Sequence, residues 1–123
     1  MSNTAELGVC YYPEHWPEEL WSSDAQSMYA NGIRWVRIAE FAWSRIEPKD
    51  NEFQWEWLDK IVEILGKAGL KIVMCTPTAT PPKWLVKKIP DMVAIDHNGR
   101  PRKFGSRRHY SFSHQGYQKE SQR

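Results

Sequence analysis

The sequence predicts an α/β fold, the N-terminal portion of a (β/α)8 TIM barrel with about three βα units, truncated. Short apolar runs with β-branched residues predict strands at residues 6–11, 33–38 and 71–75. Apolar residues that recur at intervals of three or four predict an amphipathic helix after each of the first two strands. This alternation favours parallel strands joined by right-handed crossovers.

The first predicted helix begins near Pro17 and extends to about Asn31. Proline suits the first turn of a helix, and the two glutamates that follow it favour the positive end of the helix dipole. The inner face is expected to carry Leu20, Ala25 and Met28. Gly32 supplies the stop, because glycine readily adopts the left-handed conformation that ends many helices.

The second predicted helix has the clearest apolar periodicity in the chain and ends at Gly69. Its inner face is expected to carry Leu58, Ile61, Val62, Leu65 and Ala68. The pair Asn51 and Glu52 precedes this helix and is interpreted as a helix-start signal. In the strand at 33–38, Trp35 and Val36 are expected to be buried.

The remaining segments are less regular. A long loop is expected at residues 39–54 and a short helix at 83–88, and residues 96–99 (DHNG) predict a turn because Asn-Gly favours positive φ. From Tyr117 onward the sequence predicts the beginning of a helix without a stop signal. A whole barrel needs about 250 residues, so we expect residues 1–123 to be one partial domain, truncated within or before the fourth βα unit.

Two architectures share this alternation, a doubly wound sheet and a closed barrel. A dinucleotide-binding doubly wound fold would carry a glycine-rich phosphate loop directly after its first strand. Residues 11–16 (YYPEHW) occupy that position, and their bulky side chains prevent the close approach of backbone to a pyrophosphate. A barrel is therefore favoured.

Composition and charge indicate an ordinary globular chain, with 41% hydrophobic and 26% charged residues. The net charge of +2 is unevenly distributed, because the acidic residues are concentrated before residue 97 and the segment after it is strongly basic. Cys10 and Cys75 lack CxxC spacing and are interpreted as free, buried thiols of a reducing compartment. Neither a secretory leader nor a membrane-spanning apolar run is recognised, so a cytoplasmic location is expected.

Candidate binding residues follow the strands, at the carboxyl ends where barrel enzymes build their sites. They are Tyr11, Tyr12, Glu14, His15 and Trp16 after the first strand, Arg37, Glu40, Phe41 and Trp43 after the second, Thr76, Thr78, Thr80 and Trp84 after the third, and Arg107, Arg108, His109 and Tyr110 later. Rings stack on the apolar faces of sugars and charged groups hydrogen-bond their hydroxyls, so the pattern indicates a polyhydroxylated substrate. For each residue, packing at the end of the barrel is the alternative.

Four motifs in this order resemble glycoside hydrolase family 42. They are residues 8–17 (GVCYYPEHWP), 36–44 (VRIAEFAWS), 76–85 (TPTATPPKWL) and 105–110 (GSRRHY). The resemblance covers the chain from about Leu7 onward. It implies a barrel enzyme, a retaining β-galactosidase that acts on terminal β-D-galactosides, and whole proteins that often form homotrimers.

The resemblance also implies that both catalytic carboxylates lie outside this sequence. Retention requires an acid/base and a nucleophile about 5–5.5 Å apart. In the family, the acid/base glutamate follows an asparagine at the end of the fourth strand and the nucleophile comes much later, whereas this sequence has no Asn-Glu pair after Tyr110. No catalytic residue is therefore expected here, and the isolated chain is expected to be inactive.

Substrate-binding residues do carry over from the family. Arg108 matches the family's arginine that contacts the bound galactose. A guanidinium can donate to two vicinal hydroxyls at once, which a lysine cannot do. Arg37 and Glu40 are expected to form an ion pair that shapes the floor of the site, with Trp43 beside them.

No cofactor and no metal are expected in this chain. Some family members bind a structural zinc through four cysteines, and one of those positions is Ser111 here, where a hydroxyl is a poor zinc ligand. His109 and His114 have no partner ligands at recognisable spacing and are expected to be surface or packing residues.

Three rival functions remain open. The basic tail interleaves aromatic and cationic residues as single-strand nucleic-acid binders do, although no recognition motif accompanies it. A non-catalytic carbohydrate-binding fragment is the second rival and another barrel glycosidase is the third. The four ordered motifs favour a β-galactosidase, with a galactoside as partner and neither nucleic acid nor membrane.

Overall fold

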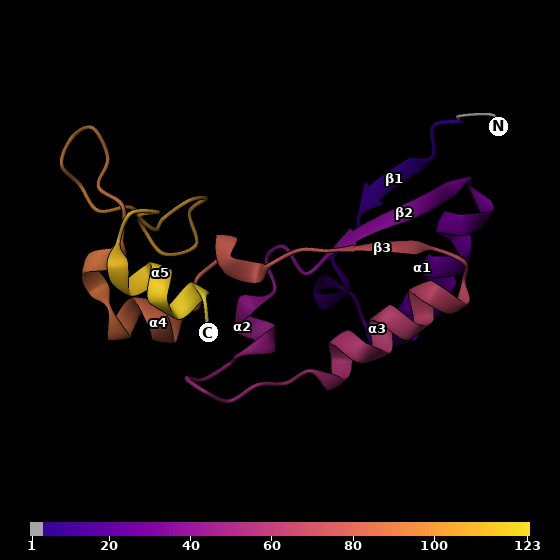
Figure 1. Cartoon of the computed structure of the whole chain (residues 1–123), viewed down its shortest axis with the longest axis horizontal. Coiled ribbons are helices and arrows are strands. Elements are labelled where there is room, and N and C mark those ends of the chain that lie inside the picture. The colour runs from indigo at the N-terminus through magenta and orange to yellow at the C-terminus, as the bar shows by residue number, and fades with distance from the viewer. Residues whose placement is uncertain (1–3) are drawn as a thin grey trace. The chain divides into compact units, whose positions relative to one another are not determined.

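The computed structural model of the chain describes residues 4–123 and shows strands followed by helices along the chain (Figure 1). These residues divide into two compact units, and each is described by itself. The first unit comprises the chain up to Glu40 together with Gln54–Thr76. The second unit comprises Phe41–Phe53 together with Pro77–Arg123.

A parallel sheet forms the centre of the first unit. Strands β1 (Leu7–Cys10), β2 (Ile33–Ile38) and β3 (Lys71–Met74) lie in the order β1-β2-β3, and both neighbouring pairs are parallel. The parallel sheet and the β-α-β-α-β order predicted from the sequence are therefore confirmed.

Two helices, α1 (Glu18–Ala30) and α3 (Glu56–Lys67), lie on the same side of this sheet (Figure 1). Val36 and Ile38 of β2 are buried, whereas Trp35 between them is 38% exposed. Successive side chains of a strand point to opposite faces, and these helices cover only one face. The prediction that Trp35 is buried is therefore wrong, and the prediction for Val36 is confirmed.

The inner face of α1 is centred on Trp21 and Ala25, which are fully buried. The predicted inner residue Leu20 is instead exposed, at 42%, and Met28 is partly buried. Trp21 and Ala25 lie one helical turn apart, and the indole N–H of Trp21 donates to the carbonyl oxygen of Pro13 at 3.0 Å. This bond and the size of the indole orient the helix on Trp21, one residue away from the predicted stripe.

The inner face of α3 agrees with its periodicity. Leu58, Ile61 and Leu65 are buried and the other predicted positions are partly buried. The helix begins at Glu56, so the interpretation of Asn51 and Glu52 as its start is wrong. Asn51 instead has a left-handed backbone (φ 63°) in a turn.

The second unit contains short helices connected by turns. They are α2 (Trp43–Ile46), α4 (Lys83–Lys88) and α5 (Gln115–Ser121), with single 3-10 turns at Pro77–Ala79 and Pro90–Met92. The predicted helix at 83–88 is confirmed, whereas α2 lies within the segment predicted as loop. At the predicted turn of 96–99, the Gly99 N–H donates to the Asp96 carbonyl oxygen at 3.0 Å and Gly99 has φ +75°.

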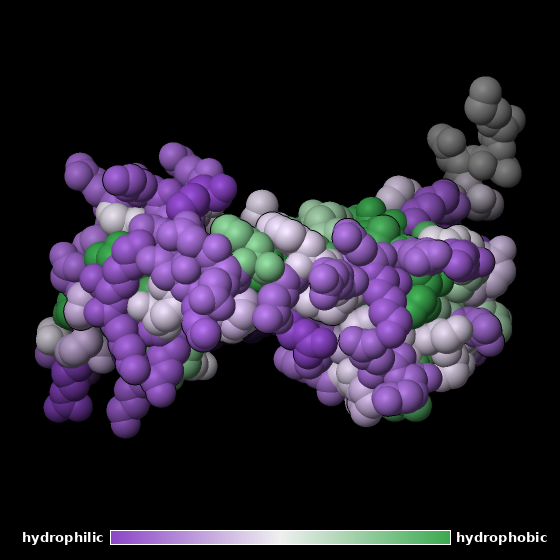
Figure 2. All heavy atoms as spheres, turned by 90° about the horizontal axis from the view of Figure 1, so that it is seen from below, coloured by the Kyte–Doolittle hydropathy of each residue, from purple (hydrophilic) through white to green (hydrophobic). Residues whose placement is uncertain are grey.

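Exposed hydrophobic residues and free thiols lie at the sheet of the first unit. Figure 2 shows hydrophobic groups at the surface over this part of the molecule, where Trp35, Val73 and Met74 are exposed. Cys10 and Cys75 are free thiols, but Cys10 is exposed, so the expectation of a buried thiol is wrong for it. Cys10 pairs in register with Arg37 at the carboxyl end of β1. Among the described residues, no helix has the length and apolarity required to cross a bilayer.

Candidate functional site

The predicted ion pair at the end of β2 is present. The Arg37 Nη2 atom lies 2.7 Å from the Glu40 Oε2 atom, and both side chains remain partly exposed. The neighbouring thiol of Cys10 and the carboxylate of Glu40 raise the pKa of Arg37, so the guanidinium is permanently charged. An exposed ion pair contributes little to stability. Because both side chains reach the surface, the pair is available for binding polar groups.

A shallow hollow lies beside this ion pair, on the sheet face that α1 and α3 leave open. It has a volume of about 300 Å³ and is lined by Gly8, Val9, Cys10, Trp35, Arg37 and Val73. At Gly8, a Cβ atom would lie 3.1 Å from the Cβ atom of Trp35, closer than ordinary packing allows. Glycine therefore leaves space for the indole of Trp35 over this face of the sheet.

Tyr11, one of the predicted binding residues, is hydrogen-bonded within the first unit. The Tyr11 hydroxyl donates to the Asp24 Oδ2 atom of α1 at 2.7 Å. Burial, and to a smaller extent the Asp24 carboxylate, raise the pKa of Tyr11. Tyr11, Trp16 and Leu20 line a second hollow of about 360 Å³ together with residues of α1. Tyr11 thus connects β1 to α1 within the first unit.

In the second unit, Arg108 has an uncommon backbone conformation for its residue type. Its φ of 55° lies in the left-handed region, its side chain is exposed, and the Arg102 guanidinium donates to the Arg107 carbonyl oxygen at 3.0 Å beside it. Residues other than glycine adopt this conformation at a cost of about 1 kcal/mol or more, and such residues cluster at functional sites.

The guanidinium of Arg108 lies within electrostatic range of Tyr110. Burial and Tyr117 raise the pKa of Tyr110, and the positive charge of Arg108 opposes this rise. The Tyr110 ring stacks on the Tyr117 ring with centroids 4.6 Å apart. Both tyrosines belong to a buried cluster completed by Trp43, Leu85 and Met92. The exposed arginine thus lies two residues before a member of this buried cluster.

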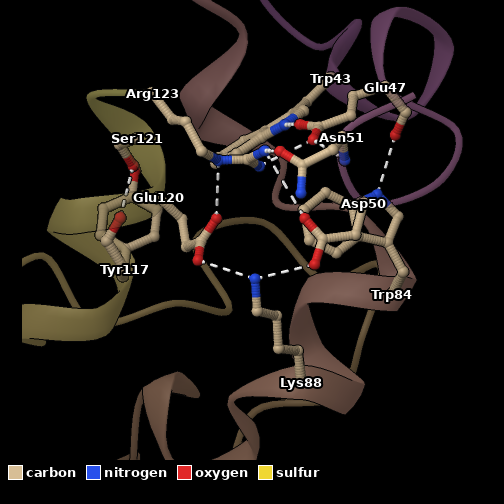
Figure 3. Close-up of polar contacts among 10 residues, drawn as sticks. All are labelled: Trp43, Glu47, Asp50, Asn51, Trp84, Lys88, Tyr117, Glu120, Ser121 and Arg123. Atoms are coloured by element: carbon tan, nitrogen blue, oxygen red, sulfur yellow. Dashed lines mark hydrogen bonds and ion pairs between the residues drawn. The ribbon is translucent and has the colours of Figure 1, made fainter. Parts of the chain in front are cut away.

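The same unit contains a buried carboxylate, that of Glu47 (Figure 3). Glu47 is 1% exposed, and its Oε2 atom accepts the indole N–H of Trp43 at 2.9 Å. Its Oε1 atom accepts the backbone N–H of Asn51 at 2.9 Å and the Nη2–H of Arg123 at 2.7 Å. Its carbonyl oxygen accepts the indole N–H of Trp84 at 2.8 Å. All polar atoms of a buried carboxylate therefore have partners, as burial requires.

The structure brings together some predicted site residues and places others in separate units. Arg37 and Glu40 are paired in the first unit, whereas Trp43 and Arg108 belong to the second. The expected position of Trp43 beside the ion pair therefore stays a prediction. Trp43 is 5% exposed, so packing dominates its surroundings.

Glu47 and Tyr117 were not predicted as site residues. Glu47 lies in a segment predicted as loop, where glutamate is normally solvated. One local signal exists, because Trp43 and Glu47 are four residues apart and face each other once a helix forms between them. Tyr117 gave no such signal, since its contacts with Tyr110 and with the Thr78 carbonyl oxygen, at 2.8 Å, are distant in sequence.

Both histidines of the basic segment have structural surroundings. His109 is buried, with its Nδ1 atom 3.1 Å from the Ser106 carbonyl oxygen. His114 precedes α5, where its Nδ1 atom accepts the Tyr117 N–H at 3.3 Å, and its Nε2 atom lies 3.0 Å from Asp91 Oδ2. Within residues 4–123, the structure contains no group of three or more side chains of the kind that hold a metal.

Known proteins resemble this chain in sequence and in fold. The family model Glyco_hydro_42, described as beta-galactosidase, matches residues 10–123. The chain belongs to glycoside hydrolase family 42. This family member is 53% identical over 117 residues to a beta-galactosidase of Thermus thermophilus, an alignment that covers 95% of this chain and 18% of the relative. It is also 51% identical over 117 residues to beta-galactosidase BgaH of Haloferax lucentense.

Solved structures agree with the family assignment. The beta-galactosidase from the psychrophilic Marinomonas ef1 matches with a TM-score of 0.91 and 56% identity, over 95% of this chain and 18% of that one. The enzyme of the Antarctic haloarchaeon Halorubrum lacusprofundi matches with a TM-score of 0.90 and 49% identity. The chain thus spans about 18% of the length of these relatives, and its fold is that of the N-terminal part of their TIM barrel.

Proposed function

We propose that this chain is part of the catalytic barrel of a retaining β-galactosidase and supplies part of its galactose-binding wall. The observation that carries the proposal is Arg108, an exposed residue on a left-handed backbone, two residues before Tyr110 of the buried cluster. It lies in the motif that resembles the galactose-contacting motif of the family. Residues 1–123 would form one partial catalytic domain, and the substrate of the whole protein would be a terminal β-D-galactoside.

Arg108 would act by binding and orienting the sugar. A planar guanidinium donates two parallel hydrogen bonds, which match two vicinal hydroxyls of a pyranose. Each hydrogen bond to a charged group contributes about 1.5–3 kcal/mol. Arg108 is exposed, so its guanidinium is available to the substrate.

Arg37 and Glu40 are proposed as further substrate-binding residues of the first unit. They lie at the carboxyl end of β2, where barrel enzymes place such residues, and both remain partly exposed. Arg37 can donate to hydroxyl oxygens and Glu40 can accept from hydroxyl groups. Trp43 is proposed to support the sugar site through packing, because little of its indole reaches the surface.

The chemical step requires two carboxyl groups about 5–5.5 Å apart, an acid/base and a nucleophile. We assign neither role to a residue of this chain, since Glu47 is fully hydrogen-bonded and buried and Glu40 is paired with Arg37. The isolated chain would therefore not hydrolyse galactosides. The proposal requires no cofactor or metal, and for the whole protein it includes a cytoplasmic location and a homotrimer as in the family.

A chimera tests this function. This chain replaces the corresponding segment of the Thermus thermophilus relative, and hydrolysis of a chromogenic β-galactoside is measured with Arg108→Lys and with Arg107→Lys as the adjacent control. Loss of one charged hydrogen bond, about 1.5 kcal/mol, should raise KM about tenfold for Arg108→Lys only. Turnover by the isolated chain, or an unchanged KM in Arg108→Lys, would contradict the proposal.

A further inference from the structure

We propose that Glu47 and Arg123 are positioning residues that set the orientation of Arg108 toward the galactoside. This inference rests on the proposed function of Arg108. Neither residue reaches the substrate in this view, because the Glu47 carboxylate is buried and Arg123 points into the unit toward it (Figure 3). Their effect would pass through the buried cluster that contains Tyr110, two residues after Arg108.

Several segments of the second unit meet at Glu47. Its carboxylate binds Trp43 and Asn51 of its own segment and Arg123 at the end of the chain. Its carbonyl oxygen binds Trp84 of α4. A single residue therefore holds three parts of the second unit that are distant in sequence.

Arg123 extends this network over a second set of acceptors. Its Nη1 atom donates to Asn51 Oδ1 at 2.5 Å, and its Nε atom lies 2.9 Å from Glu120 Oε2. Lys88 of α4 bridges Asp50 and Glu120 at 2.8 and 3.0 Å. Burial opposes the charge of Arg123, but the carboxylates of Glu47, Glu120 and Asp50 together outweigh this effect and raise the pKa of Arg123. The guanidinium remains charged in its partly buried position.

The hydrogen-bonded network of Glu47 and Arg123 is connected to the segment of Arg108 through the buried cluster. One oxygen of Glu47 orients the indole of Trp43, which packs in the same cluster as Tyr110. Glu120 lies in the last turn of α5 and Arg123 follows this helix, whose Tyr117 ring stacks on the Tyr110 ring with centroids 4.6 Å apart. Tyr110 follows Arg108 by two residues, and the N–H of the adjacent Ser111 donates to the carbonyl oxygen of Met92, a residue of the same cluster, at 2.7 Å. Trp43 and Tyr117, which share a cluster with Tyr110, thus belong to segments that the ion pair between Glu47 and Arg123 joins.

A purely structural role makes a different prediction from a positioning role. If the pair only stabilises the fold, its loss lowers the melting temperature and the amount of active protein, and KM stays constant. If it orients Arg108, its loss weakens binding of the sugar and raises KM, while kcat of the folded protein changes little. If Glu47 and Arg123 act through Arg108, the effects of their substitutions on KM will not be additive with the effect of substituting Arg108.

The experiment uses the active chimera with Glu47→Gln, Arg123→Lys, and both combined with Arg108→Lys. Lys49→Gln is the control, because Lys49 lies in the same segment, is exposed and pairs only with exposed Glu52 among the described contacts. The melting temperature, kcat and KM for a chromogenic galactoside are measured for each variant. Where Glu47→Gln does not fold, Arg123→Lys decides, since it leaves the bonds from Glu47 to Trp43 and Asn51 in place.

We expect Glu47→Gln to raise KM about fivefold with kcat within about twofold of the parent, a coupling within the usual range for connected residues. When Glu47→Gln is combined with Arg108→Lys, KM should equal that of Arg108→Lys alone. An unchanged KM in Glu47→Gln or Arg123→Lys, or KM effects that multiply with that of Arg108→Lys, would overturn the positioning role. An unchanged KM in Arg108→Lys alone would instead refute the proposed function.

Discussion

The two units of this chain are stabilised in different ways. In the first, the backbone hydrogen bonds of a parallel sheet and the apolar faces of two helices provide the structure, and its ion pairs, such as Lys60–Glu18, are exposed. In the second, short helices and turns surround a small aromatic cluster, and a buried carboxylate binds segments that are distant in sequence.

This difference separates two ways of specifying a fold. A regular sheet satisfies its own backbone, so the first unit depends mainly on where apolar side chains fall. An irregular unit leaves more polar groups to be satisfied by side chains, so the second depends on the identity of single residues such as Glu47. Substitutions should therefore act through packing in the first unit and through polar partners in the second.

The largest expected effect concerns the packing of α1. Trp21→Ala removes a fully buried indole and its bond to Pro13, and it should lower the free energy of unfolding by about 3–5 kcal/mol. Leu20→Ala, one residue earlier and exposed, should change it by less than about 0.5 kcal/mol. Urea denaturation measures both. Similar losses for the two variants would show that the inner face of α1 is misassigned.

The next effect compares the ion pairs of the two units. Arg123→Met leaves the buried Glu47 carboxylate without its charged partner and should cost about 3 kcal/mol. Lys60→Met removes one member of an exposed pair and should cost less than about 1 kcal/mol. Thermal unfolding of the two variants, each compared with the parent, measures both effects. An Arg123→Met variant as stable as Lys60→Met would mean that Glu47 finds another partner or takes up a proton.

The smallest effect is a dependence on pH within the second unit. A hydrogen bond from His114 lowers the pKa of Asp91 below its ordinary value, so the folded state favours the carboxylate. This contribution to stability is present above the pKa of the unfolded chain and is lost as the pH falls through the lower folded pKa, below about pH 4. The difference in melting temperature between the parent and Asp91→Asn should therefore shrink on acidification. A difference independent of pH would contradict this assignment.

The sequence predicted the elements of the first unit better than the faces that they bury. Strand positions and the face of α3 follow from local apolar patterns, which the structure confirms. Trp35 and Leu20 were assigned to the interior because they are large and apolar. Their exposure depends on which side of the sheet the helices cover and on the indole of Trp21, and neither is a local property.

The candidate site shows the same division. The ion pair between Arg37 and Glu40 could be predicted because its members are three residues apart at the end of a strand. Arg108 could be singled out only through a family motif, and its role stays a prediction. Glu47 and Tyr117 could not be found in this way, because their partners Arg123, Tyr110 and Thr78 come from distant parts of the sequence.

The sequence by itself determined the alternation of strands and helices, the parallel sheet and the family, since each depends on local periodicity or on short ordered motifs. Only the tertiary structure decided that Glu47 is buried, that Arg123 neutralises it, and that Tyr110 stacks on Tyr117. The physical reason is that a buried polar group needs partners from whichever segments surround it, and no local pattern encodes which segments those are.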